Sequence, residues 1–346
     1  MKLKHLILAA AAACSISAQA QTSLNLSNYS VTGTYTLDRF NGASGGLSGL
    51  EASAVTYARD RIDPFTGKLG TLFFVGDEGT GVIEISRTGQ TIGSMTFSGG
   101  SNLGWPTTST HRDSEGLTYL GGGVLVVVDE RLQDAFRFNY VAGGTVNLAD
   151  APFVSIGGNA GNVGLEGISY DPRGSGSFVS IKQQSPQDVL AGALTFATGA
   201  GGTSGMVNLF NPALMGVTTL ADIQTLSPID GLTGTAAADN LLVLSLGSRK
   251  LLEVTRSGQT LSFIDLSNIS PNNNFEGVTV DEKGIIYLVA EQDKTGGALS
   301  DAGSLLVVMA PVPEPEAYIM MLAGLGFVGV YQRRKKQQAR TQTHHA

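Results

Sequence analysis

The chain has 346 residues, a formal net charge of −7 and 46 glycines, and only 15% of its residues are charged. The two ends described below hold seven basic and two acidic residues, so residues 21–311 carry 15 basic against 27 acidic side chains. This excess of negative charge argues against nucleic acid and anionic lipid as binding partners, and it favours the binding of cations. Abundant glycine with Val, Ile, Leu, Thr and Phe favours an all-β protein.

The first 20 residues are typical of an export signal. A basic start and a short apolar run precede Ala18-Gln19-Ala20, a cleavage site of small residues. We expect cleavage between Ala20 and Gln21. Cleavage there removes Cys14, the only cysteine, and leaves no disulfide or cysteine metal site. A lipoprotein signal ending at Cys14 is the alternative, although the residues before it match such a signal poorly.

One pattern recurs five times along residues 21–311: a short start that is acid-Gly-apolar in three copies, then a turn, then an apolar strand. The starts are Ser48, Glu115, Glu166, Gln224 and Glu276, spaced by 67, 51, 58 and 52 residues. Repeats of this length with several strands each predict a five-bladed β-propeller with loop insertions. An irregular β-sandwich, or two β domains, is the alternative.

The segment Asn25–Phe40 contains a strand-like stretch at residues 29–37 but no start of its own. We expect it to supply the outer strand of the blade that residues 304–309 complete. This closure would join the two ends of the ring and cover an open sheet edge.

Acidic side chains stand at both ends of the repeated strands. The first strand of each propeller blade lines the central channel, so Glu115, Glu166 and Glu276 should converge near one mouth. Their charges repel, and Ca²⁺, which binds 6–8 oxygens, would offset them. Ser48 and Gln224 complete the predicted ligand set as neutral oxygen donors. A possible outer shell consists of Asp77, Glu78, Asp113, Asp129, Glu130, Lys182 and Glu291.

The same glutamates could instead accept backbone N–H groups of the next blade and hold the blades in register. Catalytic sets are scarce. His111 is the only histidine of residues 21–311, no Gly-x-Ser-x-Gly elbow occurs, and no zinc set can form. Trp105, the only tryptophan, could stack on a sugar or cover a channel end.

Four stretches resemble the SdiA-regulated family of bacterial propellers: DSEGLTYLGGGVLVVVDER, GLEGISYDPRGSGSFVSIK, DNLLVLSLGSRKLLEV and NFEGVTVDEKGIIYLVAEQ. The similarity spans about Asn28 to Met309. It implies a five-bladed propeller with a bound calcium ion and no established enzymatic activity. The chain departs from the family pattern at Gln224-Thr225, where Ser-Gly is usual, and at Lys182-Gln183-Gln184, where Lys-Glu is expected.

Two segments, Asp113–Leu117 and Val127–Glu130, are also similar to the esterase-like phytase domain. That similarity implies an alternative function, a calcium-dependent phosphoric-ester hydrolase. Such an enzyme needs cationic groups near its metal. The candidates are Arg112, Arg131 and Lys182.

The C-terminus contains Pro313-Glu314-Pro315, then an apolar run over Ala317–Tyr331, then a basic cluster that begins with Arg333 and Arg334. The run has 15 residues, short of the roughly 17–25 of a stable membrane span. This order resembles the PEP-CTERM sorting signal, and an ordinary membrane anchor is the alternative. The resemblance implies transient anchoring through a hydrophobic helix, cleavage by a membrane exosortase near the Pro-Glu-Pro motif, and release in a Gram-negative bacterium that makes exopolysaccharide.

The sequence therefore predicts four parts: a signal peptide (1–20), a propeller domain (21–311), a sorting signal (312–336) and a basic, polar tail (337–346). We expect an exported, monomeric, calcium-binding module rather than an enzyme. It would act in binding or scaffolding at the cell envelope or in exopolysaccharide, with no nucleic-acid partner.

Overall fold

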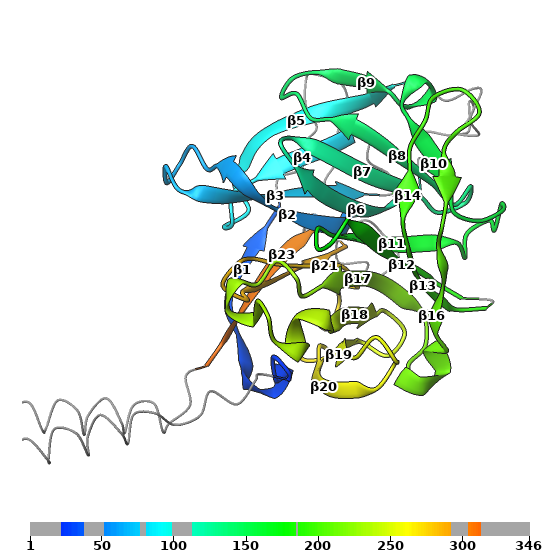
Figure 1. The fold of residues 1–346 in the computed structure, drawn as a ribbon. Helices are drawn as coiled ribbons and strands as arrows, with labels where there is room; N and C mark the ends of the chain where they lie inside the picture. Colours follow the sequence, from blue (N-terminus) through cyan, green and yellow to red (C-terminus); the bar gives the residue numbers. More distant parts are fainter. Residues whose placement is uncertain are drawn as a thin grey trace, which may run out of the picture.

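The structure, a computed structural model, describes residues 22–37, 52–76, 81–98, 113–184, 186–291 and 304–312. These residues form five antiparallel sheets arranged around a central axis (Figure 1). The helical segments among them are short 3-10 turns: η1 (Leu26–Asn28), η2 (Leu148–Asp150), η3 (Pro212–Met215), η4 (Asp230–Leu232) and η5 (Ala236–Asp239). The predicted five-bladed β-propeller is confirmed.

Each blade has four strands, which follow one another from the axis outward. Blade 1 consists of β2 (Ala52–Ile62), β3 (Leu69–Gly76), β4 (Gly81–Ile85) and β5 (Thr91–Ser98). Blade 2 consists of β6 (Ser114–Gly121), β7 (Val124–Asp129), β8 (Asp134–Asn139) and β10 (Phe153–Ser155). Blade 3 consists of β11 (Leu165–Asp171), β12 (Ser177–Lys182), β13 (Asp188–Gly192) and β16 (Val207–Phe210).

The last two blades complete the ring. Blade 4 consists of β17 (Leu220–Thr225), β18 (Leu241–Ser245), β19 (Lys250–Val254) and β20 (Thr260–Asp265). Blade 5 consists of β21 (Phe275–Val280), β22 (Ile286–Ala290), β23 (Leu305–Pro311) and β1 (Tyr29–Thr36). Because β1 pairs antiparallel with β23, the predicted closure by the N-terminal strand is confirmed.

Three short strands lie outside this scheme. The strand β9 (Thr145–Asn147) runs parallel to β5 and extends blade 1 with residues from the blade 2 connection. The strands β14 (Leu194–Thr195) and β15 (Thr203–Ser204) form a small hairpin. Buried apolar residues fill the spaces between blades, such as Val126, Leu165 and Phe178 between blades 2 and 3.

All five inner strands carry a β-bulge at their second residue, where the register with the neighbouring strand shifts. A bulge leaves one residue out of the ladder and redirects its side chain. The five bulge residues are Ser53, Glu115, Glu166, Ala221 and Glu276. This shared feature aligns the blades residue by residue.

The alignment corrects the predicted start of the fourth repeat. Ala221, and not Gln224, is the equivalent of the three glutamates, so the predicted register was wrong by three residues. The equivalent residue in blade 1 is Ser53. Ser48, the predicted equivalent in that blade, lies outside the described residues.

The glycine after each bulge glutamate lies against the inner strand of the next blade. A Cβ at Gly167 would lie 2.8 Å from Asp222 Cα, and one at Gly277 would lie 2.8 Å from Val55 N. Real Cβ atoms do not approach backbone so closely. In three blades the glutamate of the Glu-Gly pair is the bulge residue at the channel. The glycine that follows it has no side chain, which allows the backbones of neighbouring inner strands to pack closely.

A ring of hydrogen bonds, which we call the hydroxyl belt, joins the inner strands three residues beyond the bulge. Four of its bonds run from a backbone N–H to a hydroxyl of the preceding blade: Tyr57 to Thr279 (3.1 Å), Tyr119 to Thr56 (3.0 Å), Tyr170 to Thr118 (2.9 Å) and Thr225 to Ser169 (3.1 Å). The belt leaves a cavity of only about 40 Å³ in the channel. The hydroxyl groups of the belt therefore help to fix the register between blades.

The belt closes differently between blades 4 and 5. There the Thr279 hydroxyl donates to Gln224 Oε1 at 3.0 Å, and Asp222 Oδ2 accepts the N–H of Val278 at 2.8 Å. Gln224 thus stands in place of a hydroxyl, and Asp222 stands in place of the glycine found in three other blades.

We predict that Thr118→Val destabilises the protein by about 1–3 kcal/mol, because it leaves the buried N–H of Tyr170 without its acceptor. Thr118→Ser keeps the acceptor and serves as the matched control, with a smaller loss. Urea unfolding monitored by circular dichroism measures both. Equal stability of the valine and serine variants would contradict a belt that holds the blades together.

Candidate metal centre

Glutamates from three blades converge at one mouth of the channel, which we call the acidic mouth. Burial raises the pKa of Glu166 well above its ordinary value, and the charges of Glu115 and Glu130 raise it further. The pKa of Glu276 is also raised well above normal, by burial, then by Glu291, then by the charges of Glu115 and Glu166. The three predicted ligands Glu115, Glu166 and Glu276 are thus the bulge residues of β6, β11 and β21 at one end of the channel, and their role as metal ligands stays a prediction.

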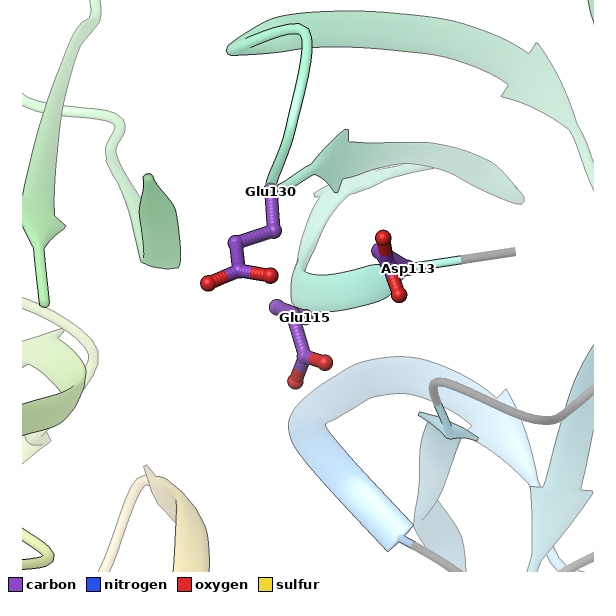
Figure 2. A group of neighbouring side chains, drawn as sticks. All are labelled: Asp113, Glu115 and Glu130. Carbon is purple, nitrogen blue, oxygen red and sulfur yellow. The ribbon is translucent and has the colours of Figure 1, made fainter. Parts of the chain in front are cut away.

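Three acids of blade 2 form the tightest group at this mouth (Figure 2). One carboxylate oxygen each of Asp113, Glu115 and Glu130 lies within 4.8 Å of the others. Asp113 directly precedes β6, Glu115 is its bulge residue, and Glu130 directly follows β7. Because β6 and β7 are antiparallel, the start of one and the end of the other meet at the same edge of the sheet.

Two pairs of acids in the mouth influence each other's pKa values: Glu130 with Glu166, and Glu276 with Glu291. Burial also raises the pKa of Glu130, although a bond from the N–H of Gly164 opposes this. A cation bound among these carboxyl groups would compete with protons for them.

Asp222 is a buried acid that sequence reasoning missed, and its side chain is only 3% exposed. Burial raises its pKa well above the ordinary value, while the N–H groups of Val278 and Ile223 act in the opposite direction. Its charge also contributes to the raised pKa of Glu166. Correct alignment of the fourth repeat would have revealed an acid in the glycine position.

Arg131 supplies positive charge at the rim of the mouth. Its Nε donates to Asp113 in an ion pair, and its second guanidinium nitrogen donates to Asn162 Oδ1 at 3.0 Å. The Asp113 carboxylate is therefore partly neutralised, while Glu115 and Glu130 face the shared space (Figure 2).

The predicted outer shell is only partly assembled. Asp113, Glu130 and Glu291 lie with the cluster. Asp129 instead accepts the N–H of Leu132 at 2.8 Å within a turn, and burial raises its pKa to about 6. Lys182 ends β12 opposite Leu165 and forms no ion pair within the described part of the chain.

Gln224 does not lie at the level of the glutamates. Three residues of strand separate it from the bulge position, which is about 10 Å along β17. Its amide donates to the carbonyl of Thr225 at 2.8 Å. It therefore belongs to the hydroxyl belt, below the acidic mouth.

Several predicted features lie outside the described residues: Ser48, Asp77, Glu78, Trp105, His111, Arg112, the Ala20–Gln21 cleavage site and the sorting motif with Pro313, Glu314, Pro315, Arg333 and Arg334. Among the residues that the structure does describe, no helix has the length and apolar character to span a membrane.

The donor set of the mouth fits a hard cation. Its side-chain donors among the described residues are carboxylate oxygens, with no histidine or cysteine. Ca²⁺ accepts 6–8 such oxygens in flexible geometry, whereas Mg²⁺ requires a stricter octahedron and Zn²⁺ prefers nitrogen and sulfur. Carboxylates that come from different blades can supply the many, irregularly placed ligands of Ca²⁺ more readily than the regular octahedron that Mg²⁺ requires.

We predict that the metal-free protein loses stability as the pH rises from about 4.5 towards neutrality. Acids with raised pKa values, including Glu166 and Glu276, stay protonated longer in the folded than in the unfolded chain, so their ionisation favours unfolding. Glu166→Gln should flatten this fall, since glutamine cannot ionise. Unfolding in chelator-containing buffers between pH 4.5 and 8 measures it. An identical pH slope in wild type and variant would contradict the assigned pKa direction.

Solved structures of low sequence identity are similar to the chain. Glutaminyl cyclase of Myxococcus xanthus is 13% identical, with 81% of this chain and 95% of that chain covered and a TM-score of 0.45. A luciferin-regenerating enzyme is 11% identical, with 80% and 95% covered and a TM-score of 0.41. The WD40 propeller domain of Doa1 is 12% identical, with 83% and 98% covered and a TM-score of 0.39.

Family profiles match two parts of the chain. The PEP-CTERM protein-sorting motif matches residues 311–336, which confirms the resemblance at the C-terminus and indicates export with targeting to the envelope or surface of a Gram-negative bacterium. The SdiA-regulated profile matches residues 46–294, from the region before β2 to just beyond β22. That match covers most of the chain and all five inner strands, so the protein belongs to the SdiA-regulated family.

Proposed function

We propose that the protein is an exported calcium-binding propeller that acts as a binding or scaffold module at the cell envelope. One observation supports this most strongly: carboxyl groups from blades 2, 3 and 5 converge at one channel mouth and raise one another's pKa values. The sorting motif at residues 311–336 supplies the route to the envelope.

Electrostatic cost is the first argument for a cation. Ionising all the acids of the mouth would bring like charges together in a partly enclosed space, where they repel more strongly than in open water. A divalent ion removes this repulsion. The residues that would hold it are Glu115, Glu130, Glu166 and Glu276, with Asp113 and Glu291 beside them.

Position is the second argument. The hydroxyl belt bridges four of the blade boundaries, and the bulge glutamates lie at a different level, at the end of the channel. A calcium ion held by Glu115, Glu166 and Glu276 would link three of the five blades across the ring. It would also offer open coordination positions to oxygen atoms of a partner, such as the carboxylates or hydroxyls of an exopolysaccharide.

Cationic groups near the mouth bear on the choice between binding and ester hydrolysis. A phosphoric-ester hydrolase needs free cationic groups beside its metal to hold the substrate. Arg131 already donates to Asp113 and Asn162, whereas Lys182, at the end of β12, forms no ion pair within the described residues. We place binding first because the family resemblance implies no established enzymatic activity, and we keep the esterase-like phytase activity as the second outcome of the test below. We further propose that the domain is a monomer whose processing partner is an exosortase.

We predict that calcium raises the melting temperature of chelator-treated protein while magnesium does so much less. At a calcium concentration 100 times the dissociation constant, the stabilisation is about 2.7 kcal/mol. Glu166→Gln should abolish most of the shift. Asp265→Asn is the matched control, because Asp265 is an exposed acid on the outer strand of blade 4.

Two results would count against this proposal. No shift at millimolar calcium, or an equal shift in Glu166→Gln, would exclude a calcium site among the bulge glutamates. Calcium-dependent hydrolysis of p-nitrophenyl phosphate that is lost in Glu115→Gln would replace the binding role with the phytase-like one.

A further inference from the structure

The hairpin between β2 and β3 ends in an exposed apolar tip, formed by Ile62, Phe65 and Leu69. Their side chains are 64%, 53% and 59% exposed. The strand β2 has 11 residues, longer than the other inner strands, so the hairpin projects from the ring (Figure 1).

The tip is an ordered turn. Asp63 Oδ1 accepts the N–H of Phe65 at 2.8 Å, and Asp63 Oδ2 accepts the Thr66 hydroxyl at 2.9 Å. The Asp63 carbonyl also accepts the N–H of Gly67, whose φ of 68° favours glycine. The turn therefore holds Phe65 outward in a fixed position. Because these bonds already order the turn, contact with a partner would not have to order it.

The chain leaves the propeller on the same face as this hairpin. The last described strand, β23, ends at Pro311 opposite Tyr29, whose hydroxyl donates to the carbonyl of Gly284 in the β21–β22 turn. Tyr57 of β2 bonds to Glu282 of that same turn. This face, which we call the tether face, lies at the far ends of the inner strands from the acidic mouth. In Figure 1 the hairpin and the end of β23 both project to the left.

Only a short connector joins the tether face to the apolar segment of the sorting signal. Residues 312–316 separate Pro311 from the run that begins at Ala317. Five residues span at most about 18 Å when fully extended. While the signal is intact and anchored, the tether face must therefore stay close to the bilayer.

Charge favours the same orientation. Four acids of the tether face form ion pairs: Arg59 with Asp230 (2.7 Å), Arg87 with Asp281 (3.1 Å), Arg173 with Asp239 (2.6 Å) and Arg256 with Asp171 (2.8 Å). Beside the tip, the carboxylates of Asp60 and Asp63 accept hydrogen bonds instead. The acidic mouth instead concentrates negative charge, which an anionic membrane repels. This difference in charge between the two faces favours an orientation in which the mouth points away from the lipid.

We propose that, before its sorting signal is cut, the propeller lies with the tether face on the bilayer, with Ile62, Phe65 and Leu69 in the headgroup region. Apolar and aromatic side chains on a projecting turn suit that boundary. The acidic mouth then points away from the membrane, open to a soluble or polymeric partner. This inference rests on anchoring by the sorting signal and is independent of calcium.

The test uses the full chain with Cys14→Ser, incorporated into vesicles of phosphatidylethanolamine and phosphatidylglycerol. A nitrobenzoxadiazole label is placed at Phe65→Cys or, as the matched control, at Gly158→Cys, an exposed loop position beside the acidic mouth. Spin-labelled lipid should quench the label at position 65 several-fold more than the label at position 158. Equal quenching, or none at position 65, would overturn the proposal.

A second variant distinguishes insertion of the apolar tip from quenching that arises only because the anchor holds the domain near the membrane. With the label at Lys68→Cys, the triple change Ile62→Ser, Phe65→Ser and Leu69→Ser should abolish most of the quenching while the protein still floats with the vesicles. Unchanged quenching would show that the tether alone sets the distance and would overturn the role of the tip. If the protein does not float with the vesicles, the sorting signal does not anchor it, and the proposal is overturned. A calcium shift in the same sample reports separately on the metal centre.

Discussion

A backbone N–H donating to a hydroxyl of the preceding blade is the interaction on which this structure depends. It occurs at four of the five blade boundaries, through Thr56, Thr118, Ser169 and Thr279. Each bond satisfies a buried donor and fixes one inner strand against the next. Because the belt sets one common level around the axis, the bulges three residues earlier also share a level. The convergence of Glu115, Glu166 and Glu276 follows from this register.

The belt and the acidic mouth divide two tasks between them. Packing between blades is performed by hydroxyl groups, close glycine contacts and Asp222, whose carboxylate binds the N–H of Val278. The glutamates lie at a different level, at the bulges that open the inner strands. Glu276 keeps part of its surface open to the channel, yet enough protein surrounds it that burial is the main cause of its raised pKa. A site of this kind is costly when empty and ionised, which is why a cation suits it.

The fold could be predicted from the sequence because the same two-part pattern recurs once per blade, which gives the number of blades. The N-terminal strand has no such start of its own, which indicates that it completes the last blade. The sequence also located three glutamates, since Glu-Gly marks a channel-facing acid beside a close backbone contact. It failed at blade 4, where Ala221 and Asp222 replace that pair and Gln224-Thr225 imitate it three residues later. The belt was missed because Thr and Ser are ordinary on strands and only the partner blade shows their role. The apolar hairpin tip was missed because the exposure of Phe65 depends on how far the β2–β3 hairpin extends beyond the other blades, which the sequence does not show.

The most direct test of the account is a crystal structure of the protein grown with calcium and recorded at a wavelength where calcium scatters anomalously. The account predicts an anomalous peak in the acidic mouth, within about 2.3–2.6 Å of carboxylate oxygens from at least two of Glu115, Glu166 and Glu276. A mouth without a peak would contradict the calcium centre.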